Sequence, residues 1–236
     1  MTNRRTIRSY VKRSGRMTEA QCRALEELWP QYGIDFAAGE LNLDRIFKRQ
    51  AGRVLEIGFG NGESLLEQAA ANPQLDYIGV EVHEPGVGHC LLLAEESGIG
   101  NLRVIVHDAL EVLELQVADG SLLRINLYFP DPWPKKRHHK RRILQPGFLQ
   151  LAARKLSADG TLHIATDWEN YAEHIDELLA SGHGFAVAER REHRGENALD
   201  RPQTKFERRG LGKGHRIWDW RLEKIHIKHQ QAGKSN

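Results

Sequence analysis

A glycine-rich turn places a carboxyl group beside backbone that a ligand can approach closely. Residues 54–57 form a short predicted strand. The segment Glu56-Ile57-Gly58-Phe59-Gly60-Asn61-Gly62 covers the end of this strand and the turn after it. The three glycines permit positive φ angles and leave room for a ligand. Enzymes that bind dinucleotides use the spacing G-x-G-x-x-G, which fits a pyrophosphate at a helix N-terminus. Here the spacing is G-x-G-x-G, and Glu56 would repel a pyrophosphate but can pair with the ammonium group of an amino acid.

Two further carboxyl groups follow the next two predicted strands. Glu81 lies at the end of residues 77–82, where it can accept hydrogen bonds from both hydroxyls of a ribose. Asp108 follows residues 102–106, where it can accept an adenine amino hydrogen. Parallel strands bring their carboxyl ends to one crevice. An ammonium, a ribose and an adenine without phosphate describe S-adenosylmethionine, so we expect a site for this cofactor made by Glu56, Gly58, Gly60, Gly62, Glu81 and Asp108.

A proline-rich segment follows the fourth predicted strand. It reads Y-F-P-D-P-W-P over residues 128–134, next to the glycine turn at the point where doubly wound sheets bind ligands. Each proline fixes its own φ and restricts the residue before it, so we expect a stiff, extended loop around Asp131. In methyl transfer the nucleophile must line up behind the carbon–sulfur bond, which favours rigid placement. The motif is similar to the D-P-P-Y type of enzymes that methylate nucleobase nitrogens.

Positive charge is concentrated in two short segments of a nearly neutral chain. The whole sequence has 34 Lys and Arg against 32 Asp and Glu, a net charge of +2. Residues 1–18 nevertheless contain six Lys or Arg and no acid, and residues 135–142 read K-K-R-H-H-K-R-R. Segregated positive charge of this kind indicates a polyanionic partner.

The elements that must position these residues alternate between strands and helices. A first helix is predicted to start at Thr18, which forms a capping box with Gln21, and to end at Pro30 and Gly33. This alternation predicts an α/β fold, a Rossmann-like doubly wound and mostly parallel seven-stranded sheet with an antiparallel C-terminal strand. The predicted strands are 54–57, 77–82, 102–106, 122–129, 161–165, 185–190 and 214–222, and the helices between them are 63–71, 85–97, 110–115, 145–156 and 167–182.

Six motifs follow one another along the chain. They are L-E-I-G-F-G-N-G, G-V-E-V-H, H-D-A, F-P-D-P-W-P-K-K-R-H-H-K-R-R, A-T-D-W-E-N-Y and R-P-x-T-K-F-E-R-R-G. In this order they resemble the bacterial tRNA (guanine-N7-)-methyltransferase family, whose members have the class I methyltransferase fold and use S-adenosylmethionine. The resemblance covers about residues 8–221. It implies that Asp131 is catalytic and also contacts the cofactor, together with Glu56, Glu81 and Asp108. It implies target-nucleotide contacts by Lys135, Asp167, Thr204, Lys205, Phe206 and Glu207. It implies RNA contacts by Arg137, His138, His139, Lys140, Arg141 and Arg142.

The resemblance and the composition suggest four segments. They are a basic flexible arm (1–17), an N-terminal helical extension (18–50), a methyltransferase domain (51–223) and a polar tail (224–236). No apolar run approaches the ~20 residues of a membrane span, and no secretory signal follows the basic N-terminus. Cys22 and Cys90 lack C-x-x-C spacing, so we expect reduced thiols, no structural metal and a cytoplasmic protein.

Several alternatives remain open at this point. Asp131, Asp167 and Glu207 are all candidates to hold the edge of the guanine, and Trp133, Phe206 or Trp168 could stack on it. A small-molecule methyltransferase would keep the glycine turn but has no use for residues 135–142. An RNA-binding module without activity would not need three acids at successive strand ends, and an NAD-dependent enzyme is disfavoured by the glycine spacing. Whether the protein is a monomer or a homodimer is left open.

Overall fold

The computed structural model describes residues 9–10, 15–195 and 199–225. The predicted flexibility of the arm at 1–17 falls mainly on residues 1–8 and 11–14, and most of the predicted tail is residues 226–236. Both segments lie outside the described residues. Thr18 caps helix α1 (Glu19–Glu27), and the capping box with Gln21 is present as predicted.

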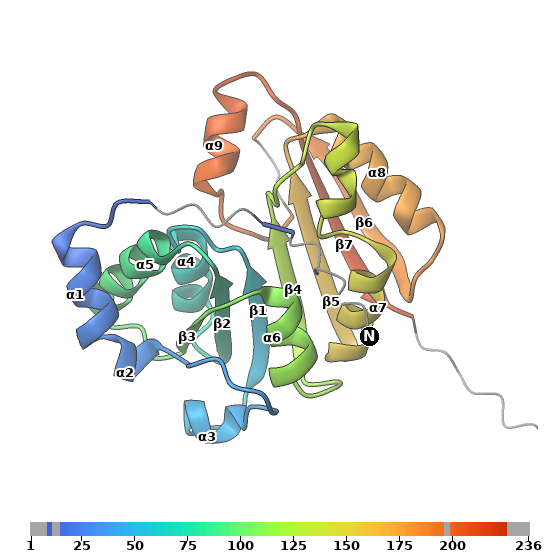
Figure 1. Ribbon diagram of the computed structural model, residues 1–236. Coiled ribbons are helices and arrows are strands. Elements are labelled where there is room, and N and C mark those ends of the chain that lie inside the picture. Colours follow the sequence, from blue (N-terminus) through green and yellow to red (C-terminus); the bar gives the residue numbers. More distant parts are fainter. Residues whose placement is uncertain (1–8, 11–14, 196–198, 226–236) are drawn as a thin grey trace, which may run out of the picture.

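The centre of the molecule is one seven-stranded sheet (Figure 1). Its strand order is β3-β2-β1-β4-β5-β7-β6. The five strands from β3 to β5 are parallel, and β7 pairs in antiparallel fashion with both β5 and β6. The predicted fold class is therefore confirmed. The strands are β1 (Gly52–Ile57), β2 (Leu75–Glu81), β3 (Leu102–Val106), β4 (Leu122–Tyr128), β5 (Leu156–Thr166), β6 (Phe185–His193) and β7 (Ile217–Lys224).

Two apolar clusters cover the two faces of the sheet. Alternate residues of one strand enter different clusters: Tyr77 packs in one, whereas Ile78 and Val80 pack in the other. Alternation with period two is expected for a strand with both faces buried. One cluster includes residues of α1, α2 (Trp29–Tyr32), α4 (Glu63–Ala71) and α5 (Glu84–Glu96). The other includes residues of α3 (Leu43–Phe47), α6 (Ala109–Gln116), α7 (Pro146–Lys155) and α8 (Glu169–Ala180).

The structure differs from the sequence prediction at several connections. Pro30 does not end a helix but occupies the first turn of α2, where its missing N–H costs nothing. β5 begins at Leu156 and runs through residues 158–160, which were predicted as a turn. Two short helices were not predicted, the 3-10 helix η1 (Lys136–Arg141) and α9 (Lys205–Leu211). In Figure 1, α9 and the connection after β4 stand at the end of the sheet where β4 and β5 terminate.

Candidate functional site

The glycine turn between β1 and α4 is tightly packed on one side and open on the other. Gly58, Gly60 and Gly62 all have positive φ angles, of +71°, +63° and +90°. A Cβ added to Gly62 would lie 2.5 Å from Sγ of the buried Cys90, whereas a Cβ added to Gly58 would meet no atom within 4 Å. The turn therefore packs against α5 at Gly62 and leaves free space at Gly58, where a ligand can approach.

The carboxylate of Glu81 holds this turn to the end of β2. Its Oε2 accepts a hydrogen bond from the backbone N–H of Gly60 at 2.9 Å. Its Oε1 accepts from the N–H groups of Val82 and His83 at 2.7 and 3.0 Å. Each carboxylate oxygen can accept more than one hydrogen bond, so these contacts leave capacity for a ligand hydroxyl. Glu81 thus orients the glycine turn in addition to its predicted role toward a ribose.

Asp108 lies at the corresponding end of β3 and caps α6. Its Oδ1 accepts a hydrogen bond from the N–H of Leu110 at 2.8 Å. The side chain is partly buried. A carboxylate that caps a helix through one oxygen is fixed in orientation, and its other oxygen is the atom available for the predicted contact with adenine.

Glu56 is the most deeply buried of the three carboxyl groups, and its hydrogen bonds come from neutral amides. Only 3% of the residue is exposed, and its Oε2 accepts hydrogen bonds from Nε2 of Gln68 at 3.0 Å and from Nδ2 of Asn126 at 3.5 Å. Burial raises the pKa of Glu56 to about 7, although these two hydrogen bonds act in the opposite direction. A buried carboxylate with this pKa favours a bound cation, which fits the ammonium group predicted for this position.

Gln68 and Asn126 belong to the site but were not predicted from the sequence. Asn126 is a polar residue in the mostly apolar strand β4, and it is completely buried. A buried polar side chain in an otherwise apolar strand needs a partner, and that pattern could have indicated it. Gln68 lies one helical turn after the start of α4, so its side chain returns to the carboxylate at the end of β1.

The loop after β4 has backbone conformations that were not predicted. Phe129 and Trp133, which precede Pro130 and Pro134, have φ angles of +51° and +45°. Left-handed conformations of such bulky residues are energetically costly and occur where the surrounding structure enforces them. The loop is therefore not extended throughout. It is held by a hydrogen bond from Nε1 of Trp133 to the backbone oxygen of Ser9 at 3.1 Å, and it presents Asp131 at the surface.

The start of helix α9 holds four of the six predicted target-binding residues, Thr204 to Glu207, and divides them into two groups. Thr204 and Glu207 form a capping box at the start of the helix, a pattern that S/T-x-x-E in the sequence also indicates. Lys205 and Phe206 are exposed, with Phe206 at 57%. A Cβ added to Gly60 would lie 3.5 Å from Cε2 of Phe206. Phe206, in the exposed half of the T-K-F-E motif, therefore lies beside the glycine turn.

The other half of the motif is tied to a buried ionic cluster. Glu207 is fully buried and pairs with Arg201, whose guanidinium also binds both oxygens of Asp219 at 2.7 and 2.9 Å. Burial alone would lower the pKa of Arg201, but Asp219 and Glu207 raise it, so it stays charged. Arg201 also lies 5.5 Å over the ring of Phe129. Glu207 is enclosed in this structure, which differs from its predicted contact with the target nucleotide.

Asp167, at the end of β5, is held by a histidine that was not predicted from the sequence. Nδ1 of His215 lies 2.9 Å from Oδ2 of Asp167, and the carboxylate is 27% exposed. A Cβ added to Gly210 on α9 would lie 2.7 Å from the same Oδ2. Asp167 is thus fixed between the end of the sheet and the end of α9, and part of its carboxylate remains accessible. A pocket beside it is lined in part by Trp168, which is 36% exposed.

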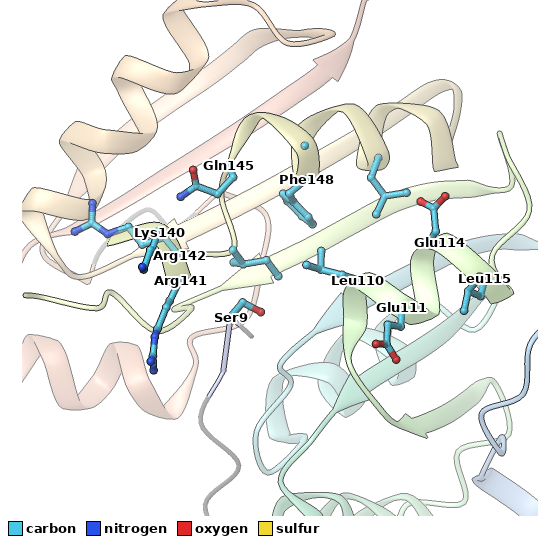
Figure 2. A pocket seen from close by; sticks show the side chains of 13 residues that line it. Ser9, Leu110, Glu111, Glu114, Leu115, Lys140, Arg141, Arg142, Gln145 and Phe148 are labelled. Atoms are coloured by element: carbon cyan, nitrogen blue, oxygen red, sulfur yellow. The ribbon is translucent and has the colours of Figure 1, made fainter. Parts of the chain in front are cut away.

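The basic run forms η1 directly after the proline loop, with Lys135 as the residue before its first turn. Lys135, Arg137, Lys140 and Arg141 are exposed, and His138 and His139 are partly buried. Desolvation and the neighbouring positive charges lower the pKa of both histidines. Figure 2 shows Arg141 extending away from Gln145 and Phe148, at one end of a groove that α6 and α7 line with side chains such as Leu110 and Phe148.

Arg142 is an exception in this run. Only 2% of it is exposed, and its guanidinium binds protein groups instead of facing solvent. The predicted RNA contact of Arg142 does not agree with this placement. The sequence alone does not distinguish Arg142 from its neighbours, because residues 135–142 contain six Lys or Arg close together.

Known methyltransferases are similar to this chain in sequence. The family described as "Putative methyltransferase" matches residues 50–220. Proteins named tRNA (guanine-N(7)-)-methyltransferase are similar over nearly the whole chain. The one from Nitrosococcus oceani is 53% identical over 220 residues, which cover 93% of this chain and 92% of the relative. The one from Shewanella piezotolerans is 51% identical over 228 residues, covering 94% and 93%.

The chain belongs to the tRNA (guanine-N(7)-)-methyltransferase family.

This methyltransferase also shares its fold with more distant solved structures. An antibiotic-related methyltransferase superposes with a TM-score of 0.57 at 15% identity, over 78% of this chain and 92% of the other. The 16S rRNA (adenine(1408)-N(1))-methyltransferase from Catenulisporales acidiphilia superposes with a TM-score of 0.57 at 17% identity, over 80% and 94%. These likenesses support the class I methyltransferase fold predicted from the sequence.

The described residues contain neither a candidate metal-binding cluster nor a candidate membrane-spanning helix. Within residues 9–10, 15–195 and 199–225, no group of three or more His, Cys, Asp or Glu side chains is arranged to hold a metal ion. None of the helices in the same part of the chain is long and apolar enough to span a membrane. Both cysteines are unpaired, and burial raises the pKa of Cys90 to about 12.

Proposed function

We propose that this methyltransferase transfers the methyl group of S-adenosylmethionine to N7 of a guanine in tRNA, giving 7-methylguanosine, and that the guanine lies in the variable loop. The proposal rests on three groups of residues that lie at the same end of the sheet. These are the carboxyl groups that end β1, β2 and β3, the Asp131 loop and the exposed cations of η1. The relatives' names support the tRNA and the guanine.

The residues of the crevice fit S-adenosylmethionine by their chemistry. Glu56 is a buried carboxylate that a cation would stabilise, and the open space at Gly58 lets backbone approach a ligand. Glu81 would accept hydrogen bonds from the ribose hydroxyls and Asp108 from the adenine amino group. When bound, the cofactor supplies a methyl group on a positively charged sulfur, so the carboxylates also lower the electrostatic cost of holding it.

Methylation of N7 does not require the removal of a proton. N7 of guanine has a lone pair in the plane of the ring and carries no proton, so no general base is required. As the new bond forms, positive charge moves onto the base, and a fixed carboxylate near the acceptor stabilises that charge. We assign this role to Asp131. Carboxylates also accept hydrogen bonds from amino groups on base edges, and the accessible oxygens of Asp131 and Asp167 are the candidates for N1 and N2 of the guanine.

Access to N7 requires the base to leave a regular helix. N7 faces the deep, narrow major groove of A-form RNA, which side chains do not reach. The target must therefore lie in a loop or leave its stack. Phe206 is the best-placed aromatic ring to receive it, because it is exposed and lies next to the glycine turn. Lys135 and the exposed cations of η1 would follow the neighbouring phosphates, which supply most of the salt-dependent affinity.

The decisive test is mass analysis of nucleosides after incubation of unmodified tRNA with the protein and isotope-labelled S-adenosylmethionine. The proposal predicts labelled 7-methylguanosine, and it predicts loss of the label when the guanine of the variable loop is replaced by adenine. Label in small acceptors but not in tRNA would indicate a small-molecule methyltransferase. Binding of tRNA without any transfer would indicate an RNA-binding module. The predicted cytoplasmic location is part of the same proposal, since tRNA is its substrate.

A further inference from the structure

Arg142 ends the basic run, yet its guanidinium is enclosed by protein groups. Its Nε donates a hydrogen bond to the backbone oxygen of Pro132 at 2.9 Å. Its Nη2 donates to Oδ1 of Asn170 at 2.8 Å and lies 3.2 Å from Nε2 of His139. The guanidinium carbon lies 4.7 Å from the centroid of the Tyr171 ring. With 2% of the residue exposed, these contacts leave little surface for a phosphate.

These partners belong to three different segments around the reaction site. Pro132 directly follows Asp131 in the proline loop, His139 is part of η1, and Asn170 and Tyr171 are in the first turn of α8. Asp167 lies just before α8. The guanidinium of Arg142 therefore connects the loop that contains Asp131 to the helix that follows Asp167. Arg142 is thus a cross-link between β4 and β5 on the side where both strands end.

The proline loop needs such a support. Phe129 and Trp133 both have left-handed backbone conformations, which persist only where surrounding contacts enforce them. The hydrogen bond to Pro132 acts between these two residues. A planar guanidinium can bind a carbonyl and an amide oxygen at the same time and stack on an aromatic ring. The ammonium of a lysine is a single point of charge and cannot reproduce that geometry.

We propose that Arg142 is a positioning residue, which fixes the loop of Asp131 relative to α8 and does not bind RNA. This inference rests on the proposed function for the role of Asp131. It separates Arg142 from the exposed cations of η1, which remain the candidates for phosphate contacts. The two roles differ in a measurable way, because a phosphate contact contributes to the salt dependence of RNA binding and a buried support does not.

The experiment compares Arg142→Gln with Lys140→Gln, each of which removes one positive charge. Lys140 is an exposed cation of η1, and its variant shows what loss of one phosphate contact does. For Arg142→Gln we expect kcat at saturating tRNA to fall at least about tenfold, the scale of a small misplacement of reacting groups. The slope of log Kd for tRNA against log salt should stay at the wild-type value. For Lys140→Gln that slope should fall by about 0.7 to 0.9.

Two further measurements test the inference, and the first does not depend on catalysis. Hydrogen exchange of the amides in residues 128–136 should be faster in Arg142→Gln than in the wild type and in Lys140→Gln. Asn170→Ala, which removes one acceptor of Arg142 from an exposed residue, should also lower kcat, with the salt slope unchanged. A reduced salt slope in Arg142→Gln, together with unchanged exchange in the loop, would overturn the proposal. Absence of methyl transfer in the wild type would instead count against the proposed function.

Discussion

Replacement of Glu56 by Gln should make the folded protein more stable at alkaline pH while it weakens cofactor binding. Burial raises the pKa of Glu56 from 4.5 to about 7, so ionisation of this group opposes folding. A group whose pKa is higher in the folded state stabilises the fold below its unfolded pKa. That contribution is lost as the pH rises through the folded pKa. Glutamine never ionises, and it keeps an oxygen that can accept the hydrogen bond from Gln68.

The magnitude follows from the difference between the pKa values of Glu56 in the folded and unfolded chain. A pKa difference of one corresponds to about 1.4 kcal/mol, so the wild type should lose about 2 to 3 kcal/mol of unfolding free energy from this group between about pH 5 and pH 8. Glu56→Gln should not show this loss. The measurement is urea unfolding of both proteins at a series of pH values without cofactor. The quantity compared is the difference in unfolding free energy between them, which should increase with pH in favour of the variant.

Cofactor binding should change in the opposite direction. The variant lacks the charge that would pair with the ammonium, so we expect its Kd for S-adenosylmethionine to be about 10- to 100-fold higher than that of the wild type at about pH 8. The Kd of the wild type should rise about tenfold for each pH unit below about pH 7, because the carboxylate is then protonated, whereas the variant should show no such dependence. A variant that is less stable than the wild type at alkaline pH and binds the cofactor equally well would refute this explanation of Glu56.

Three further predictions concern the loop, the basic segment and the glycine turn. Asp131→Ala should bind tRNA with nearly unchanged Kd, but its rate of methyl transfer in single-turnover assays should be at least about 100-fold lower. A near-normal rate would show that Asp131 has no catalytic role. Alanine at four exposed cations should weaken tRNA binding and make its salt dependence shallower, and an unchanged slope in filter binding at several salt concentrations would argue against phosphate contacts there. These four are Lys136, Arg137, Lys140 and Arg141. Gly62→Ala should lower the unfolding free energy by at least about 2 kcal/mol, because a positive φ and an overlap with Cys90 both oppose it. Gly58→Ala has the positive φ without the overlap and serves as its control, so equal destabilisation of the two would contradict the packing described for Gly62.

The parts of the fold that sequence patterns predict well are those with strong local signals. Helix α4 was predicted over 63–71 and is Glu63–Ala71, because glycines precede it and Asn72-Pro73 follow it. The capping box at Thr18 fixed the start of α1 in the same way. In β1, β2, β3 and β4 most residues are buried, so apolar runs mark these strands directly. At the ends of β1, β2 and β3, the structure places Glu56, Glu81 and Asp108 where the sequence predicted them, although their contacts with a ligand stay predictions.

The sequence could not show how side chains are distributed between surface and interior within a polar motif. Arg142 and Arg141 are identical in type and adjacent, yet one is buried and the other is exposed. Glu207 pairs with Arg201 and Asp219 joins the same cluster, which depends on how β7 is inserted between β5 and β6. Such contacts between distant segments leave no periodic pattern in the sequence. For the same reason His215, which holds Asp167, was not recognised.

The central claim is that the crevice at the ends of β1, β2 and β3 binds a sulfonium methyl donor. It is tested most directly by calorimetric titration of S-adenosylmethionine into the purified, folded chain at alkaline pH, where Glu56 is ionised. We predict saturable binding at a single site on each chain, competition by S-adenosylhomocysteine and a clear loss of affinity in Glu56→Gln. No heat of binding by a chain whose fold is verified in the same sample would contradict the claim.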